Sequence, residues 1–135
     1  MFDLTRRLEF SAAHRLASPA LSEEQNRQLY GPCYNLHGHN YALEVTVRGP
    51  VETDTGMVMD LNVLATLLHE RIFSAVDHRN LQEDVPWLEG VITTAENVAA
   101  AIWERLAPDL GGLLYRVRLW ESRHNFVDYH GPAAS

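Results

Sequence analysis

The chain has 135 residues, 46% of them hydrophobic, and this size and composition predict one globular domain, residues 1–135, with a sizeable core. Lys and Arg number 11 against 18 Asp and Glu, and the net charge of −7 argues against sequence-independent nucleic-acid binding, but not against a phosphorylated small molecule. No apolar run reaches the ~18–20 residues of a membrane span, and the N-terminus lacks the apolar segment of a signal peptide. We therefore expect a cytoplasmic protein with no membrane partner.

The N-terminal part predicts two strands separated by a loop. Residues 2–14 alternate in polarity and predict a strand that ends at His14. Residues 18–36 are polar and rich in turn residues, which predicts a long loop, and long loops in compact proteins tend to carry function. Residues 39–48 alternate again and predict the second strand.

The middle of the chain predicts two helices. Apolar side chains recur at helical spacing after Asp60, which is a good N-cap residue. A second loop over residues 77–92 precedes another helix, which Thr93 and Glu96 are expected to open as a capping box. Pro108 and the glycines that follow it are expected to end this helix.

The C-terminal part predicts two further strands, over residues 115–121 and 125–130. The resulting order β-β-α-α-β-β predicts an α+β fold, in which both helices lie on one face of an antiparallel four-stranded sheet. Such a sheet leaves two edges open, and natural proteins cover or pair their open edges. We therefore expect the chain to form homo-oligomers.

The segment CYNLHGHNY, residues 33–41, predicts a metal site. Side chains at positions i and i+2 of a strand point to the same side, so His37 and His39 can present two imidazoles together. His14 ends the first strand, which we expect to pair with the second. Three neutral imidazoles that converge match a zinc site whose fourth position is left to water or substrate.

Other interpretations stay open at this point. An H-x-H pair can arise by chance among surface histidines. The only cysteine, Cys33, excludes an intrachain disulfide, and it can be a buried small hydrophobe, a reactive thiol or a fourth ligand that closes a structural metal site. The spacing alone does not distinguish these.

Glu121 stands out on the strand predicted over residues 115–121. It is in register with Tyr115 and Leu119, on a face that should be apolar. A buried carboxylate without a partner is costly, so Glu121 is a candidate for binding a ligand. The alternative is a solvated carboxylate, or one paired with an arginine of the same strand or with Arg123.

Six short segments stand out in chain order across nearly the whole sequence: FSAAHRL (10–16), CYNLHGHNY (33–41), GMVMDL (56–61), DHRNL (77–81), TAEN (94–97) and WES (120–122). Together they resemble the 6-pyruvoyl-tetrahydropterin synthase and 6-carboxytetrahydropterin synthase family. The resemblance implies a T-fold, whose subunits join edge to edge into trimeric β-barrels that stack as hexamers. It also implies zinc as the cofactor and 7,8-dihydroneopterin triphosphate as the substrate.

Matched position by position, the resemblance assigns three zinc ligands, His14, His37 and His39. It makes Cys33 the thiolate that takes a proton from carbon, a form that nearby cations favour. Asp77 and His78 become a paired acid and base. Because adjacent side chains rarely bond to each other, a bond from Asp77 to His78 of a neighbouring subunit is the alternative to a bond within the chain.

The resemblance also assigns substrate contacts. Glu121 would hold the pterin ring, whose exocyclic amine and ring N–H suit a bidentate carboxylate. Thr94 lies in the segment that would line the pterin pocket. Arg15 and Arg79 flank the metal and acid/base motifs, and they are candidates for contacts with the triphosphate.

The spacing between Cys33 and His37 resembles the carboxy branch of the family, because the pyruvoyl enzymes usually carry two more residues there. The sequence interpretation is thus a zinc-dependent lyase of the queuosine (7-deazapurine) pathway. It would make 6-carboxy-5,6,7,8-tetrahydropterin and release acetaldehyde and triphosphate. The alternatives are the pyruvoyl synthase, a non-enzymatic metal-binding domain, and a small oxygenase that holds iron with three histidines.

Overall fold

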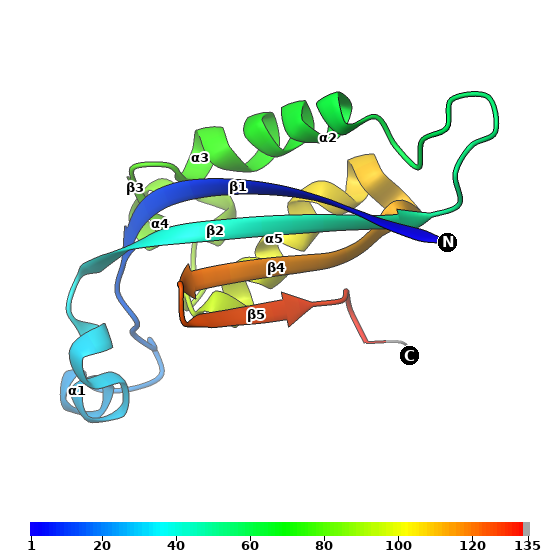
Figure 1. Cartoon of the computed structure of the whole chain (residues 1–135). Coiled ribbons are helices and arrows are strands. Elements are labelled where there is room, and N and C mark those ends of the chain that lie inside the picture. Colours follow the sequence, from blue (N-terminus) through cyan, green and yellow to red (C-terminus); the bar gives the residue numbers. More distant parts are fainter. Residues whose placement is uncertain (134–135) are drawn as a thin grey trace.

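A five-stranded sheet in the order β3-β1-β2-β4-β5 is the frame of the computed structural model, which describes residues 1–133 (Figure 1). The strands are β1 (Phe2–His14), β2 (His37–Gly49), β3 (Arg79–Asn80), β4 (Leu114–Ser122) and β5 (Asn125–Tyr129). The pairs β1–β2, β2–β4 and β4–β5 are antiparallel, and β3 runs parallel to β1. The α+β prediction is confirmed. The predicted four strands are one too few, because the two-residue β3 lies in a segment predicted as loop.

Helices α2 (Leu61–Leu68), α3 (Ser74–Val76) and α5 (Ala95–Leu110) lie together on one side of the sheet, as predicted (Figure 1). A π-helical turn, η2 (His69–Phe73), joins α2 to α3. The other helical pieces are α1 (Glu23–Tyr30), η1 (Gly31–Tyr34), α4 (Leu81–Asp84), η3 (Pro86–Leu88) and η4 (Gly111–Leu113). Among the helices of residues 1–133, none combines the length and apolar composition that a membrane crossing requires.

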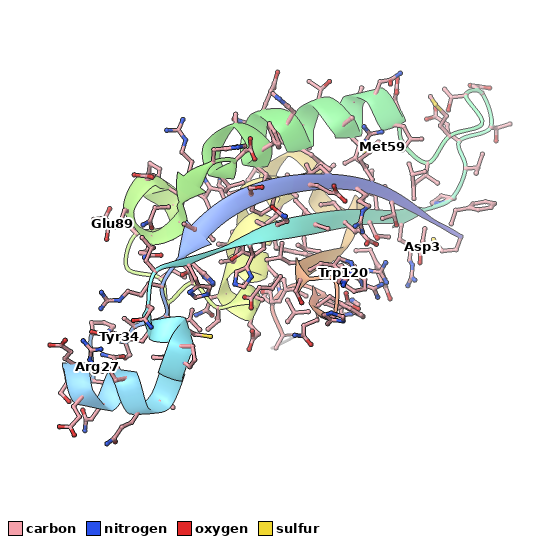
Figure 2. The ribbon with its side chains drawn as sticks, turned by 60° about the vertical axis from the view of Figure 1, so that its left-hand side comes forward. Asp3, Arg27, Tyr34, Met59, Glu89 and Trp120 are labelled. Carbon is pink, nitrogen blue, oxygen red and sulfur yellow. The ribbon has the colours of Figure 1, made fainter. Side chains whose placement is uncertain are left out.

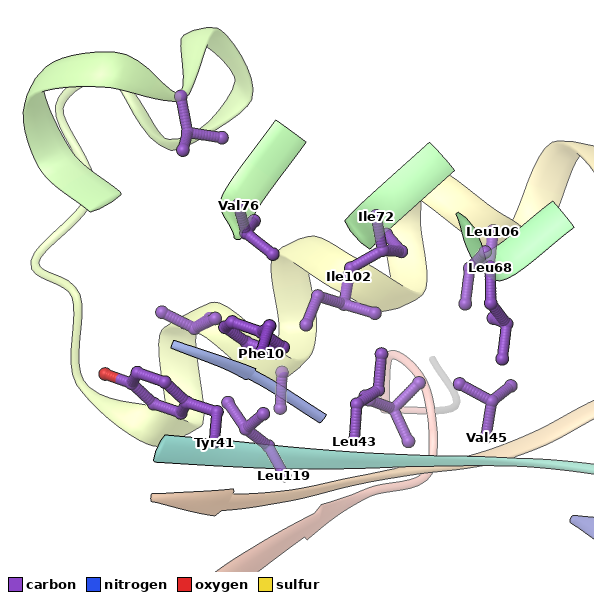
Figure 3. Packing of buried hydrophobic residues seen from close by; sticks show 14 of the residues in the cluster. Phe10, Tyr41, Leu43, Val45, Leu68, Ile72, Val76, Ile102, Leu106 and Leu119 are labelled. Atoms are coloured by element: carbon purple, nitrogen blue, oxygen red, sulfur yellow. The ribbon is translucent and has the colours of Figure 1, made fainter. Parts of the chain in front are cut away.

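The hydrophobic core fills the space between the sheet and these helices. Phe10 and Leu43 from the sheet meet Ile72 from the η2 turn, and all three are at most 3% exposed (Figure 3). Burying one such side chain contributes roughly 1.5–3 kcal/mol. Because side chains alternate along a strand, His14 and His39 project from the same face as Phe10 and Leu43. The histidines therefore continue the core face at one end of the sheet.

The segment predicted as a loop over residues 18–36 contains a helix, α1. Ser22 begins it with a capping box that Gln25 completes. Asn26 is only 5% exposed, and its amide nitrogen donates to three carbonyl oxygens, including that of Ser18 at 3.1 Å. Figure 2 shows α1 and η1 projecting beyond the end of the sheet. Hydrogen bonds rather than an apolar stripe hold this segment, so its sequence lacks the periodic signal.

The N-caps of the two predicted helices have different outcomes. Asp60 is the N-cap of α2, as predicted, and its carboxylate accepts a hydrogen bond from the backbone N–H of Asn62. The capping box expected from Thr93 and Glu96 does not form. The N-cap of α5 is Thr94, whose hydroxyl accepts from the N–H of Asn97. Thr93 is left buried in front of the helix.

The end of α5 also differs from the prediction. The helix continues through Pro108 to Leu110, and Gly111 follows it with a φ of 52°. Proline removes one helical hydrogen bond, but Leu106 and Leu110 on either side of it are buried. Their packing outweighs the missing bond, so the helix ends at the glycine.

A bulge changes the face predicted for β4. Tyr115 is an extra residue opposite the step from Thr46 to Val47, so Leu114 rather than Tyr115 enters the core. The ring of Tyr115 instead packs under the guanidinium of Arg48, 3.4 Å from the ring centroid. The predicted alternation holds only for the part of the strand beyond the bulge.

Candidate active site

Strand pairing brings three histidines together at one end of the sheet. In the β1–β2 ladder His14 lies opposite His37, and Ala12 lies opposite His39. One ligand nitrogen from each of the three imidazoles lies within 4.8 Å of the others. The ring centroids are 4.6–5.1 Å apart. The structure thus gathers the three side chains that the sequence predicted to converge.

The hydrogen bonds of these imidazoles leave nitrogen lone pairs free to bind a metal. Nδ1 of His14 donates to the carbonyl oxygen of Thr93 at 2.8 Å, and Nδ1 of His37 donates to that of Asn35 at 2.7 Å. A proton on Nδ1 leaves the lone pair on Nε2. Within residues 1–133, Nε2 of His14 and of His39 are buried without a hydrogen-bond partner. A metal ion would satisfy these two atoms.

Burial also favours the neutral form of these imidazoles. It lowers the pKa of His14 to about 4, with a smaller contribution from the two neighbouring imidazoles. Burial lowers the pKa of His39 as well. Neutral imidazole is the form that binds metal ions. The donor set, three imidazole nitrogens and no thiolate, fits a zinc ion with an open position.

Glu121 lies beside the histidines at the end of β4. Its Oε1 is 3.8 Å from Nε2 of His39, which is too long for a hydrogen bond. Glu121 and Thr94 both line a pocket of about 310 Å³, together with the backbone or side chains of Leu16, Ala95, Glu96, Asn125, Phe126 and Val127. Among residues 1–133, Glu121 forms no ion pair with an arginine. The structure therefore brings Glu121 and Thr94 together next to the histidines.

Cys33 lies in η1, in the projecting segment, and is exposed. Its carbonyl oxygen accepts a hydrogen bond of 2.9 Å from the N–H of Leu16, two residues after His14. This bond ties the cysteine turn to the end of β1. The gathered ligand atoms in residues 1–133 are those of the three histidines alone. The thiol is thus near the imidazoles in the chain path but outside their cluster.

Two arginines pack on the tyrosine that follows Cys33. The guanidinium carbon of Arg15 lies 4.1 Å from the ring centroid of Tyr34. That of Arg27 lies 5.3 Å from the same centroid (Figure 2). The backbone N–H of Arg15 also donates to Oε1 of Gln82 at 3.2 Å. The structure thus places Arg15 next to the cysteine turn.

Asp77 and His78 form a hydrogen bond with each other. Nδ1 of His78 and Oδ2 of Asp77 are 2.8 Å apart. Of the two arrangements that the sequence left open, the bond within the chain is present here, and His78 has a φ of 59°, which is uncommon for a residue other than glycine. The other carboxylate oxygen, Oδ1, accepts from the N–H of Ser11 at 3.1 Å. This backbone bond and then the bond from His78 lower the pKa of Asp77.

The Asp77–His78 pair lies apart from the histidine cluster. His78 and Arg79 line a hollow over the ends of β1 and β2, together with Ser11, Asn40 and His39. Ser11 and Asn40 alternate with the residues that carry the imidazoles, so their side chains point to the opposite face of the sheet. The side chain of His78 is 81% exposed. Within residues 1–133 neither Asp77 nor His78 belongs to the group of gathered ligand atoms.

Sequence reasoning missed two residues of this site. Thr93 was read as a helix cap, but its carbonyl oxygen fixes the ring of His14. Tyr41 lies in the second predicted strand and was not singled out, but its buried hydroxyl has no hydrogen-bond partner in residues 1–133. A polar atom on an apolar face, two residues from His39, was the signal in the sequence for Tyr41.

Comparison with known proteins supports this geometry. The family model described as 6-pyruvoyl tetrahydropterin synthase matches residues 3–132. A 6-pyruvoyl tetrahydrobiopterin synthase of Dictyostelium discoideum is 48% identical over 128 residues, covering 95% of each chain. A 6-carboxy-5,6,7,8-tetrahydropterin synthase of Haemophilus influenzae is 28% identical over 149 residues, covering 96% of this chain and 99% of that protein.

The fold has a solved counterpart. The structure of the Caenorhabditis elegans 6-pyruvoyl tetrahydropterin synthase superposes with a TM-score of 0.92 at 38% identity, and the match covers 97% of this chain and 96% of that one. The family match spans nearly the whole chain, including the three histidines, Cys33 and Glu121. The chain belongs to the 6-pyruvoyl tetrahydropterin synthase family.

Proposed function

We propose that the protein is a zinc-dependent lyase that eliminates triphosphate from 7,8-dihydroneopterin triphosphate to form 6-pyruvoyl tetrahydropterin. The observation that carries this proposal is the cluster of three imidazoles, two with buried unpaired Nε2 atoms, beside a pocket that contains Glu121. The 48% identity to a 6-pyruvoyl synthase against 28% to a 6-carboxy synthase favours the pyruvoyl product. The comparisons thus support the pyruvoyl alternative better than the carboxy product that the Cys33 spacing suggested.

His14, His37 and His39 would hold the zinc ion. The chemistry that zinc supplies in such a site is polarisation of the oxygens that it binds, which acidifies the neighbouring C–H bonds. The hydrogen bonds from Nδ1 of His14 and His37 to backbone carbonyls fix the ring planes, so Nε2 faces the site. Burial excludes water from His14, which is 1% exposed.

The pterin ring would bind in the pocket that Glu121 and Thr94 line. A carboxylate accepts two parallel N–H bonds, and the exocyclic amine and ring N–H of a pterin offer two. Glu121 would thereby orient the ring and direct the substrate side chain towards the histidines. Arg15 and Arg79 are the proposed contacts of the triphosphate, each as a fixed positive charge.

Cys33 would take a proton from a substrate carbon, and the Asp77–His78 pair would return and remove protons at the neighbouring oxygen and carbon. Asp77 suits this role because its hydrogen bond orients the imidazole and stabilises its charged form. Within residues 1–133 this pair is not part of the histidine cluster, and the His78 side chain is 81% exposed. We therefore propose that it serves the site of a neighbouring chain in a homo-oligomer, a trimer or hexamer.

Open sheet edges support this oligomer. The outer edge of β1 pairs with β3 only at Ala12 and Ala13, and β5 has no strand on its outer side in residues 1–133. Such edges present unpaired N–H and C=O groups to another chain. Sedimentation or mass photometry of the purified protein would give the number of subunits, and a monomer would contradict the shared site.

The carboxy product is a second candidate, because the interval from Cys33 to His37 resembles that branch. Incubation of the zinc-loaded protein with 7,8-dihydroneopterin triphosphate, followed by mass spectrometry, distinguishes the two. The proposal expects 6-pyruvoyl tetrahydropterin and no acetaldehyde. Acetaldehyde together with 6-carboxytetrahydropterin would establish the carboxy reaction, and an unchanged substrate would favour the non-enzymatic metal-binding alternative.

A further inference from the structure

Tyr41 in β2 carries a buried hydroxyl for which the fold supplies no partner. The residue is 1% exposed, and its ring stacks on Phe10 with centroids 4.9 Å apart. In residues 1–133 the hydroxyl makes no hydrogen bond. Figure 3 shows it pointing away from the cluster of apolar side chains that surrounds Leu43. A buried, unpaired hydroxyl costs about 1–3 kcal/mol, so its presence needs a physical reason.

Tyr41 and Glu121 follow the last pair of two neighbouring strands. The antiparallel β2–β4 ladder ends at Ala42 and Trp120, so Tyr41 and Glu121 are the next residues of the two strands, at the point where β4 changes its register against β5. Burial and, to a smaller extent, the Glu121 carboxylate raise the pKa of the Tyr41 hydroxyl.

His39 lies on the other side of the same carboxylate. Its Nε2 is 3.8 Å from Oε1 of Glu121, and its ring centroid is 5.5 Å from that of Tyr41. A metal ion on Nε2 takes up the lone pair, so this nitrogen can no longer carry a proton towards Glu121. The Tyr41 hydroxyl is a buried donor without a partner beside the same imidazole.

We propose that Tyr41 is a positioning residue, whose hydroxyl donates a hydrogen bond to the Glu121 carboxylate once the three histidines hold a metal ion. This inference rests on the proposed function for its role in pterin binding. The bond fixes the carboxylate on one side and leaves its remaining lone pairs directed into the pocket that it lines. A carboxylate fixed in this way loses less conformational freedom when a pterin ring binds.

The variant Tyr41→Phe removes the hydroxyl and keeps the ring on Phe10. In zinc-free protein the change removes an unpaired polar group, so the melting temperature should rise or stay the same. In zinc-loaded protein it removes a hydrogen bond to a charged group, so the melting temperature should fall by about 5 °C. This reversal of sign with zinc is not expected if the hydroxyl is merely a packing defect.

The matched control is Tyr129→Phe, which removes a hydroxyl from β5 and keeps the ring against Trp103. Its effect on the melting temperature should not depend on zinc. The second comparison adds Tyr41→Phe to a Glu121→Ala protein at equal protein and zinc concentrations. If the hydroxyl acts through Glu121, the zinc-dependent fall of the melting temperature should vanish in that background.

Binding of 7,8-dihydroneopterin, the substrate skeleton without its phosphates, gives the functional readout by fluorescence titration. Tyr41→Phe should weaken its binding about tenfold in the wild-type background and leave it unchanged in the Glu121→Ala background. An effect of Tyr41→Phe that persists without Glu121 would overturn the proposal, since the hydroxyl would then bond elsewhere. An equal change of melting temperature with and without zinc would also overturn it.

The experiments also distinguish a wrong pterin function from a wrong role of Tyr41. If the wild-type protein binds zinc but no pterin, while the sign reversal in melting temperature is present, the pterin function is wrong and the Tyr41–Glu121 bond stands. If the protein binds no zinc, both are wrong. If zinc and pterin bind but Tyr41→Phe behaves like Tyr129→Phe, only the role of Tyr41 is wrong.

Discussion

The histidine cluster and the Asp77–His78 pair are built in opposite ways. The cluster lies on two 13-residue strands paired along their whole length, and His14 is 1% exposed. The Asp77–His78 pair precedes a two-residue edge strand, and the His78 side chain is 81% exposed. Strand pairing thus gathers the three imidazoles within one chain, where they could hold a metal ion, whereas the Asp77–His78 pair lies in an exposed segment and, in the proposed function, serves a neighbouring chain.

The largest effect is expected from a substitution in the histidine cluster. His37→Ala removes one of three proposed ligands, so zinc content should fall from one equivalent to nearly none, and turnover should fall by more than about 100-fold. Metal analysis by mass spectrometry after dialysis measures the first effect. His69→Ala, an exposed position on η2, is the control and should keep its zinc. Full retention of zinc by His37→Ala would contradict the three-ligand site.

Cys33 tests whether the exposed segment belongs to the chemistry or to the metal site. Cys33→Ala should lower turnover by roughly 10²–10⁴-fold, the usual value of a positioned proton-transfer group. Zinc should stay bound, because the thiol lies outside the gathered nitrogens. Metal analysis next to a turnover assay checks both parts. Loss of zinc in this variant would make the thiol a ligand.

A substitution in the Asp77–His78 pair should, like Cys33→Ala, lower turnover without changing metal binding. His78→Gln should lower turnover by roughly 10²–10⁴-fold and leave zinc content unchanged. If the pair serves a neighbouring chain, mixing this variant with Cys33→Ala should restore part of the activity, because some mixed sites receive an intact copy of each group. Two inactive variants that give no activity after subunit exchange would place both groups in the site of one chain.

Asp77 also gives a pH dependence of stability. Its pKa is lowered in the folded chain from the usual 3.8, so its contribution is present above pH 3.8 and is lost as the pH falls through the folded pKa. In zinc-free protein, Asp77→Asn should therefore destabilise at pH 7. The difference from wild type should shrink at pH values below 3.8. Urea unfolding across this range measures it, and a difference that grows towards acid would have the wrong sign.

A smaller effect on the fold is expected from a substitution of Glu121. Glu121→Ala should weaken the binding of 7,8-dihydroneopterin about 10- to 100-fold, since bonds to a charged group are worth about 1.5–3 kcal/mol. The melting temperature of the zinc-free protein should change little, because the Glu121 side chain is 31% exposed. A large fall in melting temperature with unchanged pterin affinity would assign Glu121 a purely structural role.

The difference between the histidine cluster and the Asp77–His78 pair also explains which features the sequence could predict. The cluster depends on strand parity, which reads directly from the positions of His37 and His39 and from the strand that ends at His14. Asp60 as an N-cap is equally local. In these two places a local pattern predicts the structure, whereas the capping box expected from Thr93 and Glu96 does not form.

Other features depend on contacts that no local sequence pattern predicts. Helix α1 is held by the hydrogen bonds of Asn26, and β3 exists only because two residues lie against Ala12 and Ala13. The bond between Asp77 and His78 requires a positive φ at a non-glycine residue, which sequence statistics disfavour. Such tertiary constraints set the geometry of the Asp77–His78 pair, whereas the sequence shows only which two residue types are adjacent.

The central claim is that three imidazole nitrogens hold a zinc ion that has an open position and no sulfur ligand. X-ray absorption spectroscopy of the zinc-loaded protein tests it most directly. The account predicts three nitrogen neighbours at about 2.0–2.1 Å, one further light atom, and no sulfur neighbour. A zinc–sulfur distance of about 2.3 Å would place Cys33 in the coordination sphere and contradict the account.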